Sequence, residues 1–276
     1  MAAPFPSPTS TWHSTARGSG IGAETARYFA EAGASRIALL GRREQPLLDT
    51  KASIERRFPR VEVFVESMDV TNKSQVDAAF ANFVGGGRLH VLVSNAAMIG
   101  PQDPVQDVES EPFLESIQQN LKGALFLAQA FLRYASTDAV AIEISSSAAH
   151  LNFSPRCAAY SISKFAVYRL WDSLASANPN LSIFHLQPGL VDTAMSRETG
   201  GVAAFGTEDN VSLPASFNVW LASPEARFLK GKFLWANWDV DELKANEKEM
   251  AEGPQLSIGL VGWPFQEANW ESKIQL

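Results

Sequence analysis

Hydrophobic and polar positions follow two different patterns along the chain, and segments with the one pattern alternate with segments with the other. Short apolar runs, such as residues 36–40 (RIALL) and 89–93 (LHVLV), are typical of buried strands. Between such runs, apolar residues recur every three to four positions, which predicts helices that bury one face. The predicted strands are 36–40, 61–66, 89–93, 139–145, 181–186 and 232–236, and the predicted helices are 24–32, 44–57, 74–84, 111–134, 158–177 and 212–221.

This alternation predicts a single α/β domain. Strands separated by helices need crossover connections, which give a doubly wound parallel sheet with helices on both faces, a three-layer α/β/α arrangement. The alternation continues to about residue 236, with no internal repeat and no linker between two domains. The length of 276 residues is near the upper limit that one hydrophobic core supports. Residues 194–211 and 240–276 show little periodicity.

Composition and charge exclude several classes of function. The chain has 23 basic and 30 acidic residues, a net charge of -7, whereas binding to a nucleic-acid backbone needs a clustered basic face. The one cysteine, Cys157, rules out an intrachain disulfide and a Cys-rich zinc site, and the four histidines lack ligand spacing, so we expect no metal. No apolar run approaches the ~18 residues of a membrane span. The first residues do not resemble a signal peptide, so we expect a cytoplasmic protein without a membrane partner.

A glycine-rich turn precedes the first predicted helix. Residues 15–22 read TARGSGIG, and Gly18-x-Gly20-x-x-Ala23 fits the loose pattern of a dinucleotide-binding turn, in which backbone N–H groups approach a pyrophosphate at a helix N-terminus. A flexible loop before a helix is the alternative. After the next strand the chain carries Arg42 and Arg43, with no acid for a ribose hydroxyl. An arginine there can pair with a 2′-phosphate, which favours NADP over NAD, although two solvated arginines would give the same pattern.

A tyrosine and a lysine at helical spacing supply candidate proton-transfer chemistry. Tyr160 and Lys164 are four residues apart and therefore share one face of the predicted helix 158–177. A free phenol has a pKa near ~10, and a neighbouring ammonium stabilises the phenolate and brings that pKa towards the neutral range. Three serines, 145–147, end the strand just upstream, where polar catalytic groups belong in an α/β sheet.

Together these motifs resemble the short-chain dehydrogenase/reductase family, in the branch with glycine spacing G-x-x-x-G-x-G. The resemblance covers about residues 15–240 and implies a Rossmann-like fold. It also rests on Asn95-Ala96-Ala97, on Asn120 within a long helix and on residues 188–193 (PGLVDT). It implies the catalytic residues Asn120, Ser146, Tyr160 and Lys164, and the cofactor-binding residues Gly18, Gly20, Ile21, Gly22, Arg42, Asp69, Asn95, Lys122, Tyr160, Lys164, Val191 and Thr193.

The resemblance also implies a role for each catalytic position. Tyr160 would exchange a proton with the carbonyl or alcohol oxygen, Lys164 would lower the pKa of Tyr160 and hold the nicotinamide ribose, and Ser146 would hydrogen-bond the reacting oxygen. Asn120 would organise a water chain from Lys164. Ser147 is the alternative to Ser146.

Other positions keep a structural alternative. Val191 and Thr193 would seat the nicotinamide carboxamide. Asp69 would contact the adenine, or is the cap of a turn. Lys122 would reach a phosphate or ribose, or is a surface lysine.

The front of the chain departs from the family pattern. Ala16 replaces the first glycine of the turn, and residues 8–14 (PTSTWHS) stand where a central apolar strand belongs. Only Trp12 is large and apolar there. We therefore expect a degraded or missing first strand within residues 1–14: a poor strand forms, or the central position is empty. The second alternative would weaken cofactor binding, so the rival function is an impaired binding or scaffold protein with this fold.

The leading hypothesis is an oxidoreductase that transfers hydride between NADP(H) and a ketone or secondary alcohol on a medium-sized, fairly apolar substrate. Residues 194–215 would form the substrate lid, and residues 241–276 a C-terminal extension. Residues 232–243 resemble fungal members of the family, which suggests secondary metabolism. The broad apolar faces of helices 111–134 and 158–177 suggest a homodimer or homotetramer.

Overall fold

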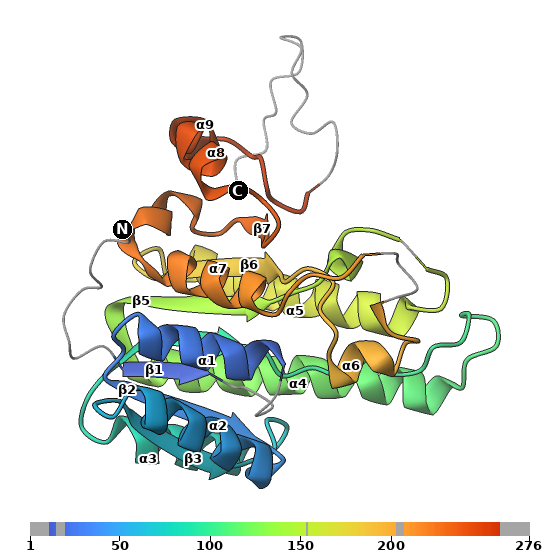
Figure 1. Ribbon diagram of the computed structural model, residues 1–276. Helices are drawn as coiled ribbons and strands as arrows, with labels where there is room; N and C mark the ends of the chain where they lie inside the picture. Colours follow the sequence, from blue (N-terminus) through green and yellow to red (C-terminus); the bar gives the residue numbers. More distant parts are fainter. Residues whose placement is uncertain (1–10, 15–19, 153, 203–206, 260–276) are drawn as a thin grey trace.

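The protein folds around one parallel sheet. The computed structural model describes residues 11–14, 20–152, 154–202 and 207–259. Its seven strands follow the order β3-β2-β1-β4-β5-β6-β7 and pair in parallel throughout (Figure 1). The strands are β1 Thr11–Ser14, β2 Arg36–Gly41, β3 Glu62–Ser67, β4 Leu89–Ser94, β5 Ala135–Ile144, β6 Ser182–Gln187 and β7 Phe233–Trp235.

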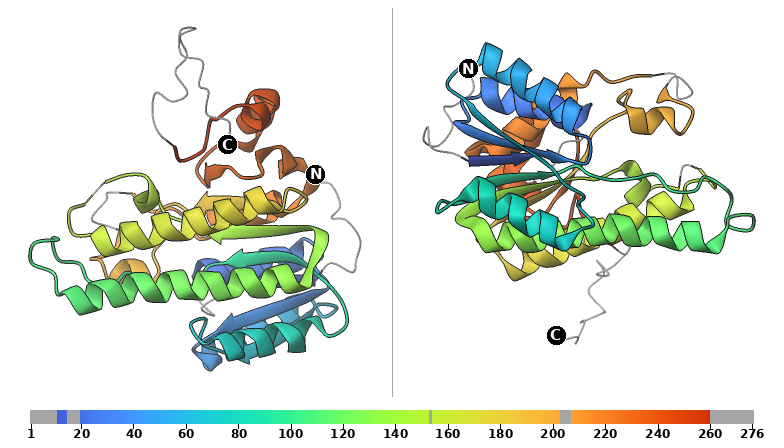
Figure 2. Two further views of the ribbon diagram at one scale, coloured as in Figure 1. Left: turned by 180° about the vertical axis from the view of Figure 1, so that it is seen from behind. Right: turned by 90° about the horizontal axis from the view of Figure 1, so that it is seen from below.

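Helices cover both faces of this sheet, which makes the three predicted layers. The helices are α1 Ile21–Glu31, α2 Glu44–Arg57, α3 Lys73–Val84, α4 Ser110–Tyr134, α5 Ala158–Ala177, α6 Ala194–Arg197, α7 Ser212–Ala222, α8 Val240–Ala245 and α9 Glu247–Glu252, with the 3-10 turns η1 Ser147–Ala149 and η3 Pro224–Leu229. Helices α1, α2 and α7 bury their apolar sides in one core. Helices α3, α4 and α5 bury theirs in a second core on the other face (Figure 2).

The central strand is present, which decides between the two expectations for the front of the chain. Strand β1 is four residues long and lies between β2 and β4. Thr11 to Ser14 pair with Arg36 to Leu39 on one side, and Trp12 to Ser14 pair with Val91 to Val93 on the other. The pairing is made by backbone groups, so a polar sequence can occupy this position when a strand on each side supplies the partners. The expectation of an empty position is therefore wrong.

Most predicted elements occur with small changes at their ends. The bounds of α2 and α5 are those predicted from the apolar pattern. Strand β5 begins at Ala135, directly after α4, and its pairing with β4 shifts register between Leu89 and Val91. Helices α8 and α9 lie in the region without periodicity. The Asp239 side chain caps α8 by accepting hydrogen bonds from the backbone N–H groups of Asp241 and Glu242.

Helix α1 is supported by a helix from the far end of the chain. The Asn218 amide of α7 donates a hydrogen bond of 3.1 Å to the Thr25 hydroxyl of α1, and both side chains are buried. Phe29 of α1 and Phe217 and Leu221 of α7 belong to the same apolar core. The helix behind the glycine-rich turn is therefore fixed both by the sheet and by α7.

Candidate functional site

The predicted site residues gather at the carboxyl edge of the sheet. Arg42, Asp69, Asn95 and Ser145 each follow the end of a strand, β2 to β5 in turn, and the carboxyl edge is where α/β proteins bind ligands. Three cavities of about 300, 100 and 10 Å³ lie along this edge, and Ala97 lines all of them. The edge therefore offers an extended site rather than a single round pocket.

Arg42 and Asp69 line the largest of these three cavities, together with Asn120 and Gly123. The Asp69 carboxylate accepts hydrogen bonds of 2.8 Å from the backbone N–H and the hydroxyl of Thr71. The backbone bond does most to lower the pKa of Asp69, and the positive charges of Arg42 and Lys122 lower it further. Asp69 is thus a turn residue that also presents a stable negative charge to the cavity.

The α4 side of this cavity is closely packed. A Cβ at Gly123 would lie 2.9 Å from a methyl group of Val70, so the helix approaches the turn after β3 at a distance that only glycine permits. Lys122 is exposed, and its ammonium lies 5.9 Å from the ring centre of Phe126. Lys122 therefore stands at the margin of the cavity and is not one of its lining residues.

The described part of the glycine-rich turn has the conformation that an anion site requires. Gly20 has φ of 64° and precedes α1 without a side-chain cap among the described residues. A Cβ at Gly20 would lie 3.2 Å from the Thr193 methyl group. The first N–H groups of an 11-residue helix at an uncapped end can bind a phosphate. Ile21 lines the adjoining cavity and Gly22 is buried; Gly18 lies outside the described residues.

Tyr160 and Lys164 both line the 100 Å³ cavity, which is also lined by Gly20, Asn95 and Thr193. The Lys164 ammonium is 5.8 Å from the ring centre of Tyr160 and donates a hydrogen bond of 2.6 Å to the Ile144 carbonyl. Lys164 is only 6% exposed. A buried positive charge next to a phenol stabilises the phenolate, so this arrangement fits proton exchange at the Tyr160 hydroxyl.

The three serines after β5 occupy different environments. Ser146, the predicted residue, accepts a hydrogen bond of 3.2 Å from the Ala148 N–H and caps η1. The Ser147 N–H donates to the Gln187 side chain over 3.3 Å. Ser145 lines the cavity beside Tyr160, and its buried hydroxyl has no hydrogen-bond partner among the described residues. Ser145 is one of the three serines noted at the strand end, but the predicted role was given to Ser146, with Ser147 as the alternative.

Asn120 is buried and fixes the loop after β4. Its side-chain oxygen accepts from the Met98 N–H and its amide donates to the Met98 carbonyl, both over 2.9 Å. It also lines two of the three cavities, one of which contains Lys164. Asn120 therefore joins α4 to the loop that runs between the two larger cavities.

The segment after β6 is held at both ends. Val191 is buried, and the Thr193 hydroxyl caps the short helix α6 by accepting from the Ser196 N–H over 3.1 Å. Further along the chain, the Asp209 carboxylate accepts a bond of 2.8 Å from the Leu190 N–H. A Cβ at position 189 would lie 2.6 Å from this carboxylate, so Gly189 is needed for the contact.

Loops after three different strands are tied together near the site. Gln102, after β4, donates through its side-chain amide to the Glu198 carbonyl over 2.9 Å. Arg156, after β5, donates to the Gln102 carbonyl over 2.8 Å. The loop after β6, to which Glu198 belongs, is thereby fastened to both of the others.

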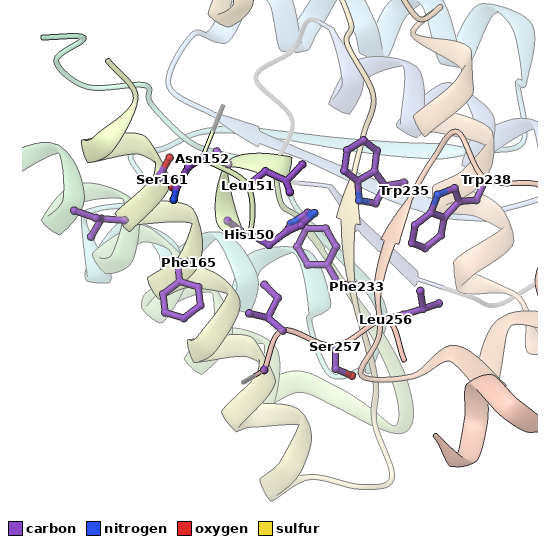
Figure 3. Close-up of a pocket in the computed structure, with 15 residues that line it drawn as sticks. His150, Leu151, Asn152, Ser161, Phe165, Phe233, Trp235, Trp238, Leu256 and Ser257 are labelled. Atoms are coloured by element: carbon purple, nitrogen blue, oxygen red, sulfur yellow. The ribbon is translucent and has the colours of Figure 1, made fainter. Parts of the chain in front are cut away.

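A larger cavity of about 770 Å³ lies elsewhere (Figure 3). It contains none of the predicted catalytic residues. Its wall includes Phe165 of α5 and the aromatic side chains of His150, Phe233, Trp235 and Trp238. We assign the chemistry to the smaller cavities, because they contain the buried ammonium and the phenol. Trp235 and Trp238 line this larger cavity and not the ones that contain those groups.

Comparison with known proteins identifies the family. The family model for short chain dehydrogenases matches residues 14–201. The chain belongs to the short-chain dehydrogenase/reductase family. A short chain dehydrogenase/reductase of Claviceps purpurea is 32% identical over 90% of this chain and 85% of its own length. The short chain dehydrogenase/reductase AacuD of Aspergillus aculeatus is 34% identical over 90% of this chain and 87% of its own length.

Solved structures of the family share the fold. A gluconate 5-dehydrogenase from Burkholderia cenocepacia, in complex with NADP and tartrate, has a TM-score of 0.72 at 28% identity, over 84% of this chain and 95% of that one. A short-chain type dehydrogenase/reductase from Mycobacterium ulcerans has a TM-score of 0.75 at 24% identity, over 82% and 87% of the two chains. The predicted family and the Rossmann-like fold are thus confirmed, and the protein is an oxidoreductase of a family that uses nicotinamide cofactors.

The described residues offer neither a metal centre nor a membrane-spanning helix. They contain no cluster of three or more His, Cys, Asp or Glu side chains that could hold a metal ion. In the same ranges, every helix falls short of the length or apolar character that a membrane span requires.

Proposed function

We propose that this short-chain dehydrogenase/reductase transfers hydride between NADP(H) and a ketone or secondary alcohol, with Tyr160 as the general acid and base. The observation that carries the proposal is the buried Lys164 ammonium, 5.8 Å from the Tyr160 ring in the wall of one cavity. The bound nicotinamide supplies or accepts the hydride. The positive φ of Gly20, the uncapped start of α1 and the cavity beside Arg42 and Asp69 fit a dinucleotide that lies along the sheet edge.

The proposed mechanism assigns a task to each catalytic side chain. Tyr160 gives its hydroxyl proton to the substrate oxygen during reduction and takes a proton from the alcohol during oxidation. Lys164 keeps a positive charge beside the phenol, so that less energy is needed to form the phenolate. Ser146 donates a hydrogen bond to the substrate oxygen, with Ser145 and Ser147 as alternatives. Alanine substitution at each serine distinguishes them, because only the residue that contacts the oxygen will lower the rate about 10²-fold or more.

The neighbours of these groups hold the cofactor in this proposal. Asn120 links the Met98 loop to the cavity next to Lys164, where a water chain can carry the proton onward. Gly18, Gly20, Ile21 and Gly22 form the pyrophosphate turn, and Asp69 and Asn95 border the adenosine half. Lys122 approaches a ribose or phosphate from the margin, and Val191 and Thr193 contact the carboxamide.

The preference for NADP rests on Arg42. Its side chain is exposed, it lines the cavity after β2, and its guanidinium can bind a 2′-phosphate. The NADP complex of the Burkholderia relative shows that a protein with this fold and 28% identity accepts that cofactor. We expect NADPH to bind more tightly than NADH, and Arg42→Asp to weaken NADPH binding about 10- to 100-fold while NADH binding changes little.

Fluorescence titration of the whole chain with each cofactor, followed by assays on a panel of ketones, tests the function. Arg43→Asp is the matched control, because Arg43 is the neighbouring residue and does not line the cavity. Absence of NADPH binding at millimolar concentration would favour the rival, a binding or scaffold protein with an impaired cofactor site. Equal NADPH affinity in wild type and Arg42→Asp would contradict the phosphate assignment alone.

The proposal includes a medium-sized, fairly apolar substrate, with residues 194–215 as its lid. Met195 lines the cavity of Tyr160, and the loop that begins there is fastened through Glu198 and Asp209. Fungal relatives at 32% and 34% identity agree with a role in secondary metabolism. We propose a cytoplasmic enzyme, with residues 241–276 as an extension to the catalytic domain.

We also propose a homodimer or homotetramer formed through α4 and α5. Leu114 and Leu132 of α4 and Ile162 and Phe165 of α5 are each more than 40% exposed, which is unusual for large apolar side chains on neighbouring helices. Light scattering at micromolar concentration tests the assembly. A monomer would contradict this part of the proposal without affecting the chemistry.

A further inference from the structure

A buried carboxylate lies directly behind the proposed active site. Glu143 belongs to β5, whose neighbouring residues Ile142 and Ile144 are apolar, and Glu143 is only 1% exposed. A carboxylate at such a depth costs several kcal/mol unless it is paired and hydrogen-bonded. An acidic residue buried near the carboxyl end of an inner strand therefore needs a specific reason.

His185 of the neighbouring strand β6 supplies the first partner. Its Nδ1 lies 3.2 Å from Oε2 of Glu143. When Glu143 is ionised it only accepts hydrogen bonds, and the imidazole then donates through Nδ1–H. The imidazole is fully buried, with its ring centre 4.4 Å from that of Tyr168 and 6.5 Å from that of Phe233, to which it is nearly parallel. The histidine is held in place and in turn fixes the carboxylate.

Lys164 supplies the second partner. Oε1 of Glu143 lies 3.9 Å from the Lys164 ammonium and has no hydrogen-bond partner among the described residues. The cavity of about 10 Å³ next to these groups is lined by Ser94 and Asn120 as well, and its size is on the order of one water molecule. Glu143 is therefore the carboxylate that pairs with the lysine of the proposed proton-transfer pair.

We infer that Glu143, fixed by His185, is a positioning residue that holds the Lys164 ammonium in place and sets the pH at which the Tyr160–Lys164 pair releases a proton. The inference deepens the proposed function and rests on the roles given there to Tyr160 and Lys164. Loss of a proton makes that pair more negative, and a neighbouring negative charge opposes the loss. Neutralising Glu143 should thus make the pair ionise at lower pH.

The other groups around Glu143 do not reverse this expected shift to lower pH. Helix α5 presents Lys164 and Tyr168, and β6 presents His185. Strand β4 and helix α4 contribute Ser94 and Asn120 to the cavity, and neither of these titrates. Burial raises the pKa of Tyr168, so its phenol stays protonated to higher pH than an ordinary phenol does.

An ultraviolet titration of the cofactor-free protein tests the inference. Phenolate absorbance is followed against pH for wild type and Glu143→Gln, each with and without Tyr160→Phe, so that the difference isolates Tyr160. We expect Glu143→Gln to move the Tyr160 midpoint to lower pH by about one pH unit. Glu143→Asp, which keeps the charge, should stay near wild type. Glu225→Gln is the matched control, because Glu225 forms an exposed ion pair with Lys244.

The outcomes separate this inference from the proposed function. An unchanged midpoint in folded Glu143→Gln overturns the inference, whether or not the protein is active. A shifted midpoint in a protein without hydride transfer supports the inference and contradicts the proposed function alone. Glu143→Met gives a second neutral variant of similar volume should Glu143→Gln not fold. In an active enzyme, the rate of ketone reduction by Glu143→Gln should begin to fall at a lower pH than that of wild type. The KM for NADPH should change little.

Discussion

The Lys164 ammonium donates a hydrogen bond of 2.6 Å to the carbonyl oxygen of Ile144, and this contact ties α5 to the carboxyl end of β5. This hydrogen bond uses one of the three N–H donors of the ammonium. The other two can bind groups in the cavity or the Glu143 carboxylate. The lysine is therefore fixed by the sheet itself, one helical turn from Tyr160.

Tyr160→Phe removes the hydroxyl that we propose exchanges the proton, and leaves the ring. We expect turnover to fall about 10²- to 10⁴-fold, because this is the usual contribution of a positioned acid or base. The melting temperature should change little, and any loss of NADPH affinity should be far smaller than the loss of turnover, although Tyr160 is also expected to contact the cofactor. Steady-state kinetics measure turnover, and fluorescence titration measures NADPH affinity. Tyr134→Phe, at the end of α4, is the control, and an equal loss of rate in that variant would contradict the assignment of Tyr160.

Gly20→Ala should strain the turn before α1. Gly20 has φ of 64°, and a Cβ there would lie 3.2 Å from the Thr193 methyl group. The left-handed conformation costs a non-glycine residue about 1–2 kcal/mol, and we expect a matching loss in the free energy of unfolding and weaker NADPH binding. Chemical denaturation measures the free energy of unfolding, and fluorescence titration measures NADPH binding. Gly86→Ala meets nothing within 4 Å, so it should stay within about 0.5 kcal/mol of wild type.

Asp209→Ala should loosen the segment after β6. The carboxylate accepts hydrogen bonds from the Leu190 N–H and the Asn237 amide, both over 2.8 Å. Loss of both should cost about 1–3 kcal/mol of unfolding free energy and lower kcat/KM. Hydrogen exchange at the Leu190 amide should become faster. Glu208→Ala, at the exposed neighbouring position, is the control, and a similar effect there would argue against a specific role of Asp209.

The Asp69 carboxylate should make stability depend on acid pH. Its pKa lies below the ordinary value of 3.8, chiefly because the Thr71 N–H donates to it. A lowered pKa gives stability that is present above the ordinary value and lost as pH falls through the lowered one. Asp69→Asn should therefore be less stable than wild type at pH 7, and the difference should shrink below about pH 4.

Free energies of unfolding at several pH values measure this dependence. Asp107→Asn, on an exposed loop, should follow wild type at every pH. A difference between wild type and Asp69→Asn that stays constant down to pH 2 would contradict the role of the charge.

Local patterns predicted the longer helices and every strand except β1, because a buried face leaves a regular spacing of apolar residues. The bounds of α2 and α5 followed from that spacing alone. Strand β1 could not be predicted in this way, because its place is secured by backbone pairing with β2 and β4. Short α8 and α9 were missed for a related reason: six residues are too few for a period to become visible.

In the candidate site too, residues with a local spacing could be predicted, and residues paired with distant partners could not. Tyr160 and Lys164 share one helix, so their spacing revealed them, and the structure brings them to one cavity. The partners of Glu143 and Asp209 lie 42 and 19 residues away, at His185 and Leu190. No local pattern encodes such pairs. The acidic residue within the apolar strand 139–145 was the one available signal, and the predictions from sequence did not use it.

The hydrogen bond between Thr25 and Asn218 joins residues 193 positions apart. During synthesis, α1 therefore leaves the ribosome long before the helix that covers its apolar side. A nascent chain that ends before α7 should expose Phe29 and its neighbours and bind chaperones that recognise apolar surface. Helix α1, although encoded near the start of the chain, would then be among the last parts of the molecule to become stable.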